Sequence, residues 1–236
     1  MKVVITGVGR RLGFELAQHF LTQGHQVIGT YRQSYPEIAT LDSMGAELYP
    51  LELTDRTAVQ QFADDIAHKH PSIDVLIHNA SAFSPTPDDR TQALTDFDTF
   101  SSVHIQVPFI LNETLRDNLA NSTYQHGNII HLTDIYVQKP SPKFRLYCAS
   151  KAALQSLNDS YAISLAPKIR VNAILPGPLA FLPEHSEAAK KQVLAATPLQ
   201  TLGGFSPVIQ TVDYIINNPY LTGASIRVDG GRSLAM

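Results

Sequence analysis

The fold is decided by the stretch Val3-Val4-Ile5-Thr6-Gly7-Val8-Gly9-Arg10-Arg11-Leu12-Gly13. Its first four residues form a short apolar run that predicts a buried strand, and the glycines that follow predict a tight turn. Beyond the turn, Leu12, Leu16, Phe20 and Leu21 recur at helical spacing. Glycines at such a turn let the backbone approach a diphosphate, and a helix N-terminus offers free N–H groups and a partial positive charge. The stretch therefore predicts a nucleotide-binding strand–turn–helix unit.

The rest of the chain repeats this alternation of short apolar runs with longer helical segments. The predicted strands are Val3–Thr6, Gln26–Gly29, Glu47–Leu53, Ile73–His78, Asn128–Leu132, Arg170–Leu175 and Ser225–Val228. Besides the helix after the first strand, the predicted helices are Thr57–His70, Asp96–Asn118 and Arg145–Leu165. Apolar strands separated by helices are typical of an α/β fold, a Rossmann-like doubly wound parallel sheet. No linker or repeat interrupts the pattern, so we expect residues 1–236 to form a single domain.

Two irregular stretches, Ser81–Thr91 and Pro176–Pro183, follow predicted strands, and a short helix is expected after the second. In doubly wound sheets the loops at the carboxyl ends of the strands form the ligand crevice, so both stretches should border it. We expect residues 178–201 to act as a lid over that crevice.

Composition excludes several classes of function. The 236 residues carry 18 Lys and Arg against 21 Asp and Glu, a net charge of −3 that gives no reason to expect nucleic-acid binding. The single cysteine, Cys148, excludes an intrachain disulfide and fits a reducing compartment. The apolar runs are too short for a signal sequence or a membrane span, so we expect a cytoplasmic protein. The histidines show no metal-ligand spacing, and we expect no catalytic metal.

The end of the second predicted strand bears on the choice of cofactor. NAD-selective sites place an acid there to bind the ribose hydroxyls. This chain has instead Thr30-Tyr31-Arg32-Gln33-Ser34, with no acid. Arg32, helped by Arg10 and Ser34, can pair with a 2′-phosphate through charge-assisted hydrogen bonds, although a solvated loop arginine is the simpler alternative. The absence of an acidic residue and the presence of Arg32 together favour NADPH.

Tyr147 and Lys151 are four residues apart at the start of a predicted helix, and they therefore share one face. A nearby ammonium stabilises a phenolate, so we expect Lys151 to lower the pKa of Tyr147 and to make it a better proton donor. The pair follows a predicted strand and a loop that carries Asp134.

With these motifs the chain resembles the short-chain dehydrogenase/reductase family over nearly its whole length. The matching pieces are Thr6-Gly7, Asn79-Ala80-Ser81, Tyr147-x-x-x-Lys151, Pro176-Gly177 and the ending Thr222 to Gly231. The resemblance implies that Tyr147 is the proton donor and that Lys151 holds the nicotinamide ribose. It also implies a homotetramer built on the third and fourth helices. The implied cofactor contacts are Gly7, Arg10, Arg11, Leu12, Gly13, Tyr31, Arg32, Leu53, Asn79, Ala80, Ser81, Lys151, Pro176 and Gly177.

Three departures from the family pattern narrow this resemblance. Arg11 stands where the family has glycine, Asp134 replaces the usual serine thirteen residues before the tyrosine, and His104 replaces an asparagine. Together they resemble the pteridine-reductase branch, which implies NADPH-dependent reduction of a dihydropterin, with dihydrofolate as a further substrate. In that branch Phe83 would stack on the pterin, and Ser81 and Arg11 would bind its polar edge. The implied substrate contacts are Arg11, Ser81, Phe83, Asp134 and Tyr147, with Tyr147, Lys151 and Asp134 as the catalytic set.

Several alternatives stay open at this point. Donation of a proton by Asp134 requires a raised pKa, which burial favours and Lys151 opposes. His104 is either a relay partner or a satisfied helix histidine, and Phe83 is either a substrate contact or a loop anchor. A reductase of the same fold acting on a ketone, such as a 3-oxoacyl thioester, is a second hypothesis for function. A nucleotide-sensing protein without turnover is a third, because fold alone does not fix function.

Overall fold

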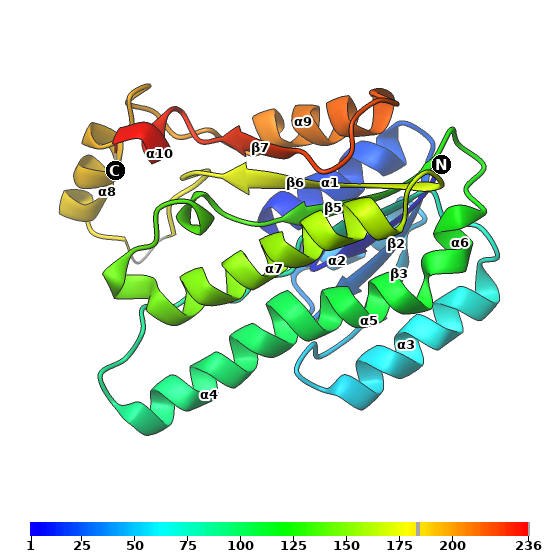
Figure 1. The fold of residues 1–236 in the computed structure, drawn as a ribbon, viewed down its shortest axis with the longest axis horizontal. Coiled ribbons are helices and arrows are strands. Elements are labelled where there is room, and N and C mark those ends of the chain that lie inside the picture. Colours follow the sequence, from blue (N-terminus) through cyan, green and yellow to red (C-terminus); the bar gives the residue numbers. More distant parts are fainter. Residues whose placement is uncertain (183–184, 236) are drawn as a thin grey trace.

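The computed structural model describes residues 1–182 and 185–235, so Pro183 of the irregular stretch and residues 183–184 of the expected lid lie outside the described residues. Seven parallel strands form one sheet in the order β3-β2-β1-β4-β5-β6-β7 (Figure 1). This is the predicted Rossmann-like α/β fold. The strands are β1 Lys2–Thr6, β2 Gln26–Tyr31, β3 Glu47–Pro50, β4 Val75–His78, β5 Gly127–Leu132, β6 Ile169–Pro176 and β7 Ser225–Val228.

Helices cover both faces of the sheet, because alternate strand residues point to opposite sides. Val3 and Ile5 of β1 pack with α1, α2 and α9, whereas Val4 between them packs with α3, α5 and α7. The second group lies in front of the sheet in Figure 1. The centres of both layers are largely apolar. The layer that contains α5 and α7 also buries a chain of hydrogen-bonded polar side chains, His78, Asn112, His131 and Asn158.

The long helices come close to their predicted bounds, with one exception. The helices are α1 Arg11–Thr22, α2 Pro36–Ser43, α3 Arg56–Lys69, α4 Arg90–Ser101, α5 Val107–Thr114, α6 Arg116–Ala120, α7 Arg145–Ser164, α8 Glu187–Ala195, α9 Ser206–Asn217 and α10 Arg232–Ala235. The prediction of one helix over Asp96–Asn118 is wrong at its start and in its continuity. The helix starts at Arg90 because the Asp89 side chain accepts a hydrogen bond from the Gln92 amide at 2.8 Å, a regular N-cap. It is then interrupted by a π-helical turn, η1, at Ser102–Gln106.

The carboxyl ends of all seven strands lie along one edge of the sheet, since every neighbouring pair is parallel. This edge collects the turn after β1, the loops after β4 and β5, and the segment after β6. No helix among the described residues is long and apolar enough to cross a membrane.

Candidate active site

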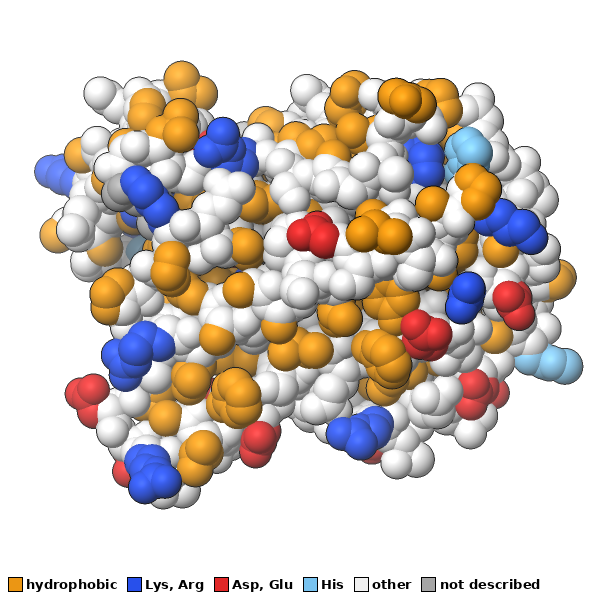
Figure 2. All heavy atoms as spheres, in the orientation of Figure 1, with side chains coloured by type: hydrophobic (Ala, Val, Ile, Leu, Met, Phe, Trp, Pro, Cys, Tyr) orange, Lys and Arg blue, Asp and Glu red, His pale blue; other side chains and the backbone are white. Residues whose placement is uncertain are grey.

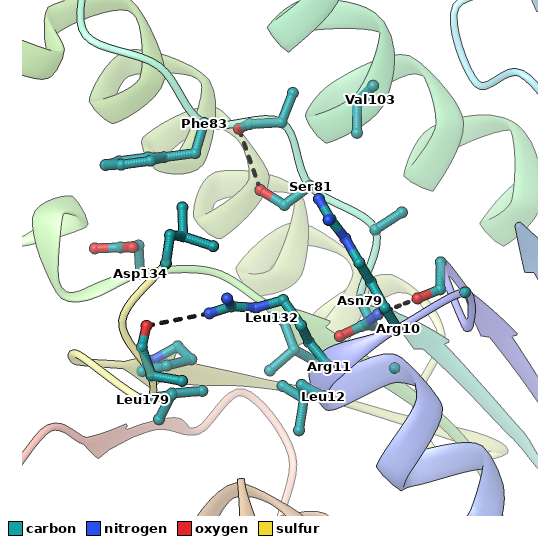
Figure 3. Close-up of a pocket in the computed structure, with 18 of the residues that line it drawn as sticks. Arg10, Arg11, Leu12, Asn79, Ser81, Phe83, Val103, Leu132, Asp134 and Leu179 are labelled. Carbon is teal, nitrogen blue, oxygen red and sulfur yellow. Dashed lines mark hydrogen bonds between the residues drawn. The ribbon is translucent and has the colours of Figure 1, made fainter. Parts of the chain in front are cut away.

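A cavity of about 640 Å³ opens at this edge of the sheet, and every residue predicted for the site lines it (Figure 3). The nucleotide turn, the ends of β2 and β4, the loop after β5, the start of α7 and the end of β6 all contribute. The predicted residues found there are Gly7, Arg10, Arg11, Leu12, Gly13, Tyr31, Arg32, Leu53, Asn79, Ala80, Ser81, Phe83, Asp134, Tyr147, Lys151, Pro176 and Gly177. His104 does not line the cavity; it lies buried directly behind Ser81.

The turn between β1 and α1 is held in shape from β4. Gly7 has a φ of +76°, and a Cβ there would lie 2.9 Å from the Ala80 Cα. The side-chain nitrogen Nδ2 of Asn79 donates to the carbonyl oxygens of Thr6 and Gly7, each at 3.0 Å. A Cβ on Gly13 would lie 2.0 Å from the Gly7 oxygen. The glycines therefore allow close backbone packing, and the Asn79 side-chain amide, at the cavity wall, braces the turn.

The residues around this turn fit a phosphorylated dinucleotide. No side chain caps the N-terminus of α1 among the described residues, and its first turn has no acidic residue, so its dipole and N–H groups remain available to an anion. Arg10 and Arg32 both line the cavity, and the Arg10 guanidinium lies 5.0 Å from the centre of the Tyr35 ring. Both guanidinium groups thus offer charged hydrogen-bond donors to an anionic ligand in this cavity.

The Tyr147 ring is caged by other aromatic side chains. Phe83, Phe100 and His104 approach it edge to face, with ring centres 4.8, 6.0 and 5.6 Å away. Tyr147 is 5% exposed, whereas Phe83 is 52% exposed and presents its free surface to the cavity. Phe83 is thus not a buried loop anchor, and its open face is available to a flat ligand.

The Tyr147 hydroxyl donates to Asp134 Oδ2 at 2.8 Å, and Asp134 Oδ1 accepts from the Tyr136 amide at 2.8 Å. Burial raises the pKa of the Asp134 carboxyl, and this effect outweighs the opposing influence of Lys151. The expected lowering of the Tyr147 pKa is wrong for this structure. Burial, followed by the negative charge of Asp134, raises the pKa of Tyr147 well above its ordinary value. In both groups burial shifts the protonation equilibrium toward the protonated form.

Lys151 lies one helical turn from Tyr147 and is 2% exposed. Its Nζ donates to the Leu132 carbonyl oxygen at 2.7 Å and lies 5.8 Å from the centre of the Tyr147 ring. Burial lowers the pKa of Lys151 to about 8, although Asp134 partly offsets this effect. The ammonium is therefore held by the backbone at the end of β5, close to the reacting groups.

Arg11 connects the nucleotide turn to the segment after β6. Its backbone has a φ of +55°, the conformation for which glycine is favoured. Its Nη2 donates to the Ala180 carbonyl oxygen at 3.2 Å, and its guanidinium lies 5.8 Å from the Phe205 ring centre. Figure 3 shows this side chain extending across the cavity. The guanidinium is thereby placed between the cofactor turn and the far wall.

Sequence reasoning missed several residues that complete the cavity wall. They come from the segment after β6, from α8 and α9, and from the C-terminal helix: Phe181, Leu182, His185, Val193, Phe205 and Arg232. Arg232 Nη1 donates to the Val193 carbonyl oxygen at 2.8 Å and so ties α10 to α8. Phe181 and Leu182 lie in the irregular stretch that was expected to border the crevice, and His185 and Val193 lie in the expected lid, although none was named. No local pattern marks Phe205 and Arg232, which only the folded chain brings to the strand ends.

Comparisons with known proteins agree with this geometry. A family model described as "Enoyl-(Acyl carrier protein) reductase" matches residues 7–233. Dihydromonapterin reductase of Enterobacter sp. (strain 638) is 36% identical over 236 residues, covering 98% of this chain and 96% of the relative. The same enzyme of Escherichia coli (strain SMS-3-5 / SECEC) is 36% identical, covering 99% and 97%.

A solved structure extends the comparison to three dimensions. FolM Alternative dihydrofolate reductase 1 from Brucella canis, complexed with NADP, superposes with a TM-score of 0.87 at 29% identity. The match covers 100% of this chain and 94% of that chain. The resemblance drawn from the motifs is confirmed: the chain belongs to the short-chain dehydrogenase/reductase family of NAD(P)-dependent oxidoreductases.

Proposed function

We propose that this protein is an NADPH-dependent dihydropterin reductase that converts 7,8-dihydromonapterin to tetrahydromonapterin and also accepts dihydrofolate. The observation that carries this proposal is the 2.8 Å bond between Tyr147 and Asp134 at the cavity wall. A ketone reductase needs hydroxyl donors to an oxygen, whereas a C=N bond needs a proton delivered to a ring nitrogen. A carboxyl group with a raised pKa is suited to that delivery. The dihydromonapterin reductases at 36% identity support the same substrate class.

The cavity also suits a flat, polar ring. The exposed face of Phe83 offers a stacking surface, and aromatic pairs of this kind contribute about 0.5–1.5 kcal/mol beyond area burial. Ser81 and Arg11 reach the same cavity and offer a hydroxyl and a guanidinium to the polar edge of the ring. We assign these three residues to substrate binding.

NADPH, when bound, supplies the hydride that reduces the C=N carbon. Arg10, Arg32, the β1–α1 turn and Lys151 would hold it, and Arg32 would pair with the 2′-phosphate. In the reacting complex the bond between Tyr147 and Asp134 runs opposite to its direction in the ligand-free site: Asp134 carries a proton on Oδ2 and donates to the Tyr147 oxygen. The Tyr147 hydroxyl gives its proton to the ring nitrogen, forming N–H, and the Asp134 proton replaces it on the Tyr147 oxygen. The step leaves Asp134 as a carboxylate, which recovers its proton from solvent. Lys151, cationic below a pKa of about 8, stabilises the transient negative charge on Tyr147.

The family description favours one competing substrate, an acyl thioester. Such a substrate would place a carbonyl oxygen against Tyr147. The carboxyl of Asp134 in the position of a family serine, and the aromatic cage around Tyr147, make this second candidate the weaker one.

A substrate panel tests the proposal. Purified protein is mixed with NADPH and, separately, with dihydromonapterin, dihydrobiopterin, dihydrofolate and an acetoacetyl thioester, and loss of nicotinamide absorbance is followed. We expect turnover of dihydromonapterin and slower turnover of dihydrofolate. Turnover of the thioester alone would sink the pterin assignment, and turnover of none of them would favour a sensor.

A pair of variants on one helix links this activity to the site. Tyr147→Phe is expected to lower kcat by about 10²–10⁴-fold, the usual contribution of general acid catalysis, with NADPH binding retained. Tyr161→Phe is the matched control, because Tyr161 is a buried tyrosine of α7 whose hydroxyl donates to Glu113 at 2.6 Å, away from the cavity. An unchanged kcat in Tyr147→Phe would remove Tyr147 from the proton path.

We further propose that the protein works as a homotetramer. Hydrophobic side chains gather over α4, α5 and α7 on the face shown in Figure 2. Leu94, Phe97, Phe109 and Ile163 are all exposed there, with Ile163 82% exposed. An apolar face of this kind is typical of a protein–protein contact. Sedimentation velocity tests the assembly: Phe109→Glu is expected to dissociate it, whereas Tyr220→Glu on another surface is not.

A further inference from the structure

His104 is a buried polar side chain that the proposed reaction does not use. It sits in the π-helical turn η1, is 1% exposed, and hydrogen-bonds to two separate segments, the loop after β4 and helix α7. Its Nε2 lies 2.8 Å from Ser81 Oγ and accepts from the Ala82 amide at 3.3 Å. Its Nδ1 lies 2.8 Å from Ser150 Oγ. π-Turns of this kind occur frequently at functional sites.

The hydrogen-bond network fixes which ring nitrogen carries the proton. The Ser150 hydroxyl donates to the Tyr147 carbonyl oxygen at 2.8 Å, so its oxygen is left to accept from His104 Nδ1. The Ala82 amide can only donate, so Nε2 must accept. Burial, together with the positive charge of Lys151, lowers the pKa of His104 well below its ordinary value. The ring is therefore neutral, with its proton on Nδ1.

This tautomer decides the role of the Ser81 hydroxyl. Ser81 has one proton, and the short 2.8 Å contact to Nε2 takes it in preference to the 3.3 Å contact with the Ala82 carbonyl oxygen. Ser81 Oγ lines the cavity and also interacts with the Tyr147 hydroxyl, and its remaining acceptor capacity is offered to a ligand beside that hydroxyl. We propose that His104 is a positioning residue that turns Ser81 into a hydrogen-bond acceptor, so that the site selects a substrate with an N–H donor at that edge.

The inference rests on the proposed function, because an amino or ring N–H group is what a pterin presents and a simple ketone lacks. His104 also joins the loop after β4 to helix α7, because its Nε2 contacts Ser81 and its Nδ1 contacts Ser150. His104 itself stays behind the wall and touches neither substrate nor cofactor. Its ring packs against the Tyr147 ring at 5.6 Å, and its hydrogen-bonding effect on the substrate passes through Ser81.

A double-mutant cycle between His104→Leu and Ser81→Ala tests this coupling. Loss of a well-placed buried hydrogen bond costs about 1–1.5 kcal/mol, so His104→Leu is expected to raise the KM for the dihydropterin about tenfold. The kcat and the Kd for NADPH should change little, because only binding of the substrate edge is weakened. In the Ser81→Ala background, His104→Leu should cause no further rise in KM. Equal, additive rises in both backgrounds would overturn the proposal and leave His104 a packing residue.

Control variants separate this effect from a general loss of stability. His70→Gln removes another buried histidine, which bonds to Glu47 near the amino end of β4, and its KM should equal that of the wild type. If His104→Leu does not fold, Ser150→Ala removes the acceptor that holds the tautomer and enters the same cycle. Additivity of Ser150→Ala with Ser81→Ala would overturn the proposal in the same way.

A measurement without substrate distinguishes failure of the inference from failure of the proposed function. The ¹⁵N shifts of histidine-labelled ligand-free protein, read by solid-state NMR and assigned with His104→Gln, report the tautomer of His104. A neutral ring with Nδ1 protonated supports the inference even if the panel shows no pterin turnover. A proton on Nε2 overturns it even if dihydropterins are reduced.

Discussion

Lys151→Met should change how the stability of the protein depends on pH. The Lys151 side chain is buried, with 2% of its surface exposed, and burial lowers the pKa of its ammonium group from 10.5 to about 8. In the unfolded chain the same group recovers its ordinary pKa. Between these two values the unfolded state holds a proton that the folded state has released. Unfolding therefore takes up a proton, and raising the pH through this window stabilises the wild type.

The magnitude follows from the two pKa values. Each pH unit between them is worth about 1.36 kcal/mol, so the folded protein bears a cost of about 3 kcal/mol below pH 8. Between pH 7 and pH 9.5 the free energy of unfolding of the wild type should rise by about 2 kcal/mol relative to that of Lys151→Met. The reason is that methionine at position 151 does not titrate.

Urea unfolding of both proteins across this pH range measures the difference. The chain has no tryptophan, so far-ultraviolet circular dichroism is the natural signal. Lys69→Met is the control, because Lys69 is an exposed lysine paired with Glu47. The difference in unfolding free energy between the wild type and Lys69→Met should not rise with pH. A difference between wild type and Lys151→Met that stays constant across the range would refute the reasoning.

Three further predictions concern the cofactor, the proton donor and the nucleotide turn. Arg32→Ala should raise the Kd for NADPH about 10–100-fold and that for NADH far less, since one or two charge-assisted hydrogen bonds of about 1.5–3 kcal/mol are lost; Arg90→Ala on the surface of α4 is the control. Asp134 donates only when protonated, so kcat should fall as the pH rises through its raised pKa, and Asp134→Asn should lose this limb along with about 10²-fold in kcat. Gly13→Ala should destabilise the protein by about 3 kcal/mol, because its Cβ would lie 2.0 Å from the Gly7 oxygen, and Gly9→Ala, with 3.4 Å to its nearest neighbour, should not.

Each of these three predictions has a result that would contradict it. Equal losses of NADPH and NADH affinity would remove Arg32 from the 2′-phosphate. A kcat profile identical in wild type and Asp134→Asn would mean that another group delivers the proton. Equal stability of the Gly13 and Gly9 variants by urea unfolding would show that the turn can relax around a side chain.

The features predicted from sequence are those that local spacing determines. The strand–turn–helix of residues 3–13 and the pairing of Tyr147 with Lys151 depend on neighbours within a few residues, and both lie at the cavity. Placement of the remaining site loops followed from one rule of topology, that parallel strands end at a common edge.

Three helices escaped prediction: α9, α2 and the four-residue α10, which is too short to show a periodicity. The helix α9 buries Val208, Val212, Ile215 and Ile216 at regular spacing, but Pro207 in its first turn resembles a breaker although it is harmless there. The helix α2 has eight residues and only two buried side chains, so its periodicity is weak. The π-turn that carries His104 adds a residue per turn, which an apolar pattern does not reveal.

The electrostatics of the site could not be worked out from spacing. Burial raises the pKa of Asp134 and Lys151 lowers it. Which effect is larger depends on how completely the folded chain encloses the carboxyl, and burial is the larger effect. The pKa of Tyr147 was predicted to fall and instead rises, because its hydroxyl faces the carboxyl and its ring is enclosed by Phe83, Phe100 and His104. Such enclosure is a tertiary property.

The most direct test of the central claim is a crystal structure of the ternary complex with NADP⁺ and a dihydropterin. The account predicts that the pterin lies against Phe83 with a ring nitrogen within about 2.6–3.2 Å of the Tyr147 hydroxyl, the distance of a productive proton donor. A pterin bound with its ring nitrogens beyond reach of Tyr147, or outside the cavity altogether, would contradict it.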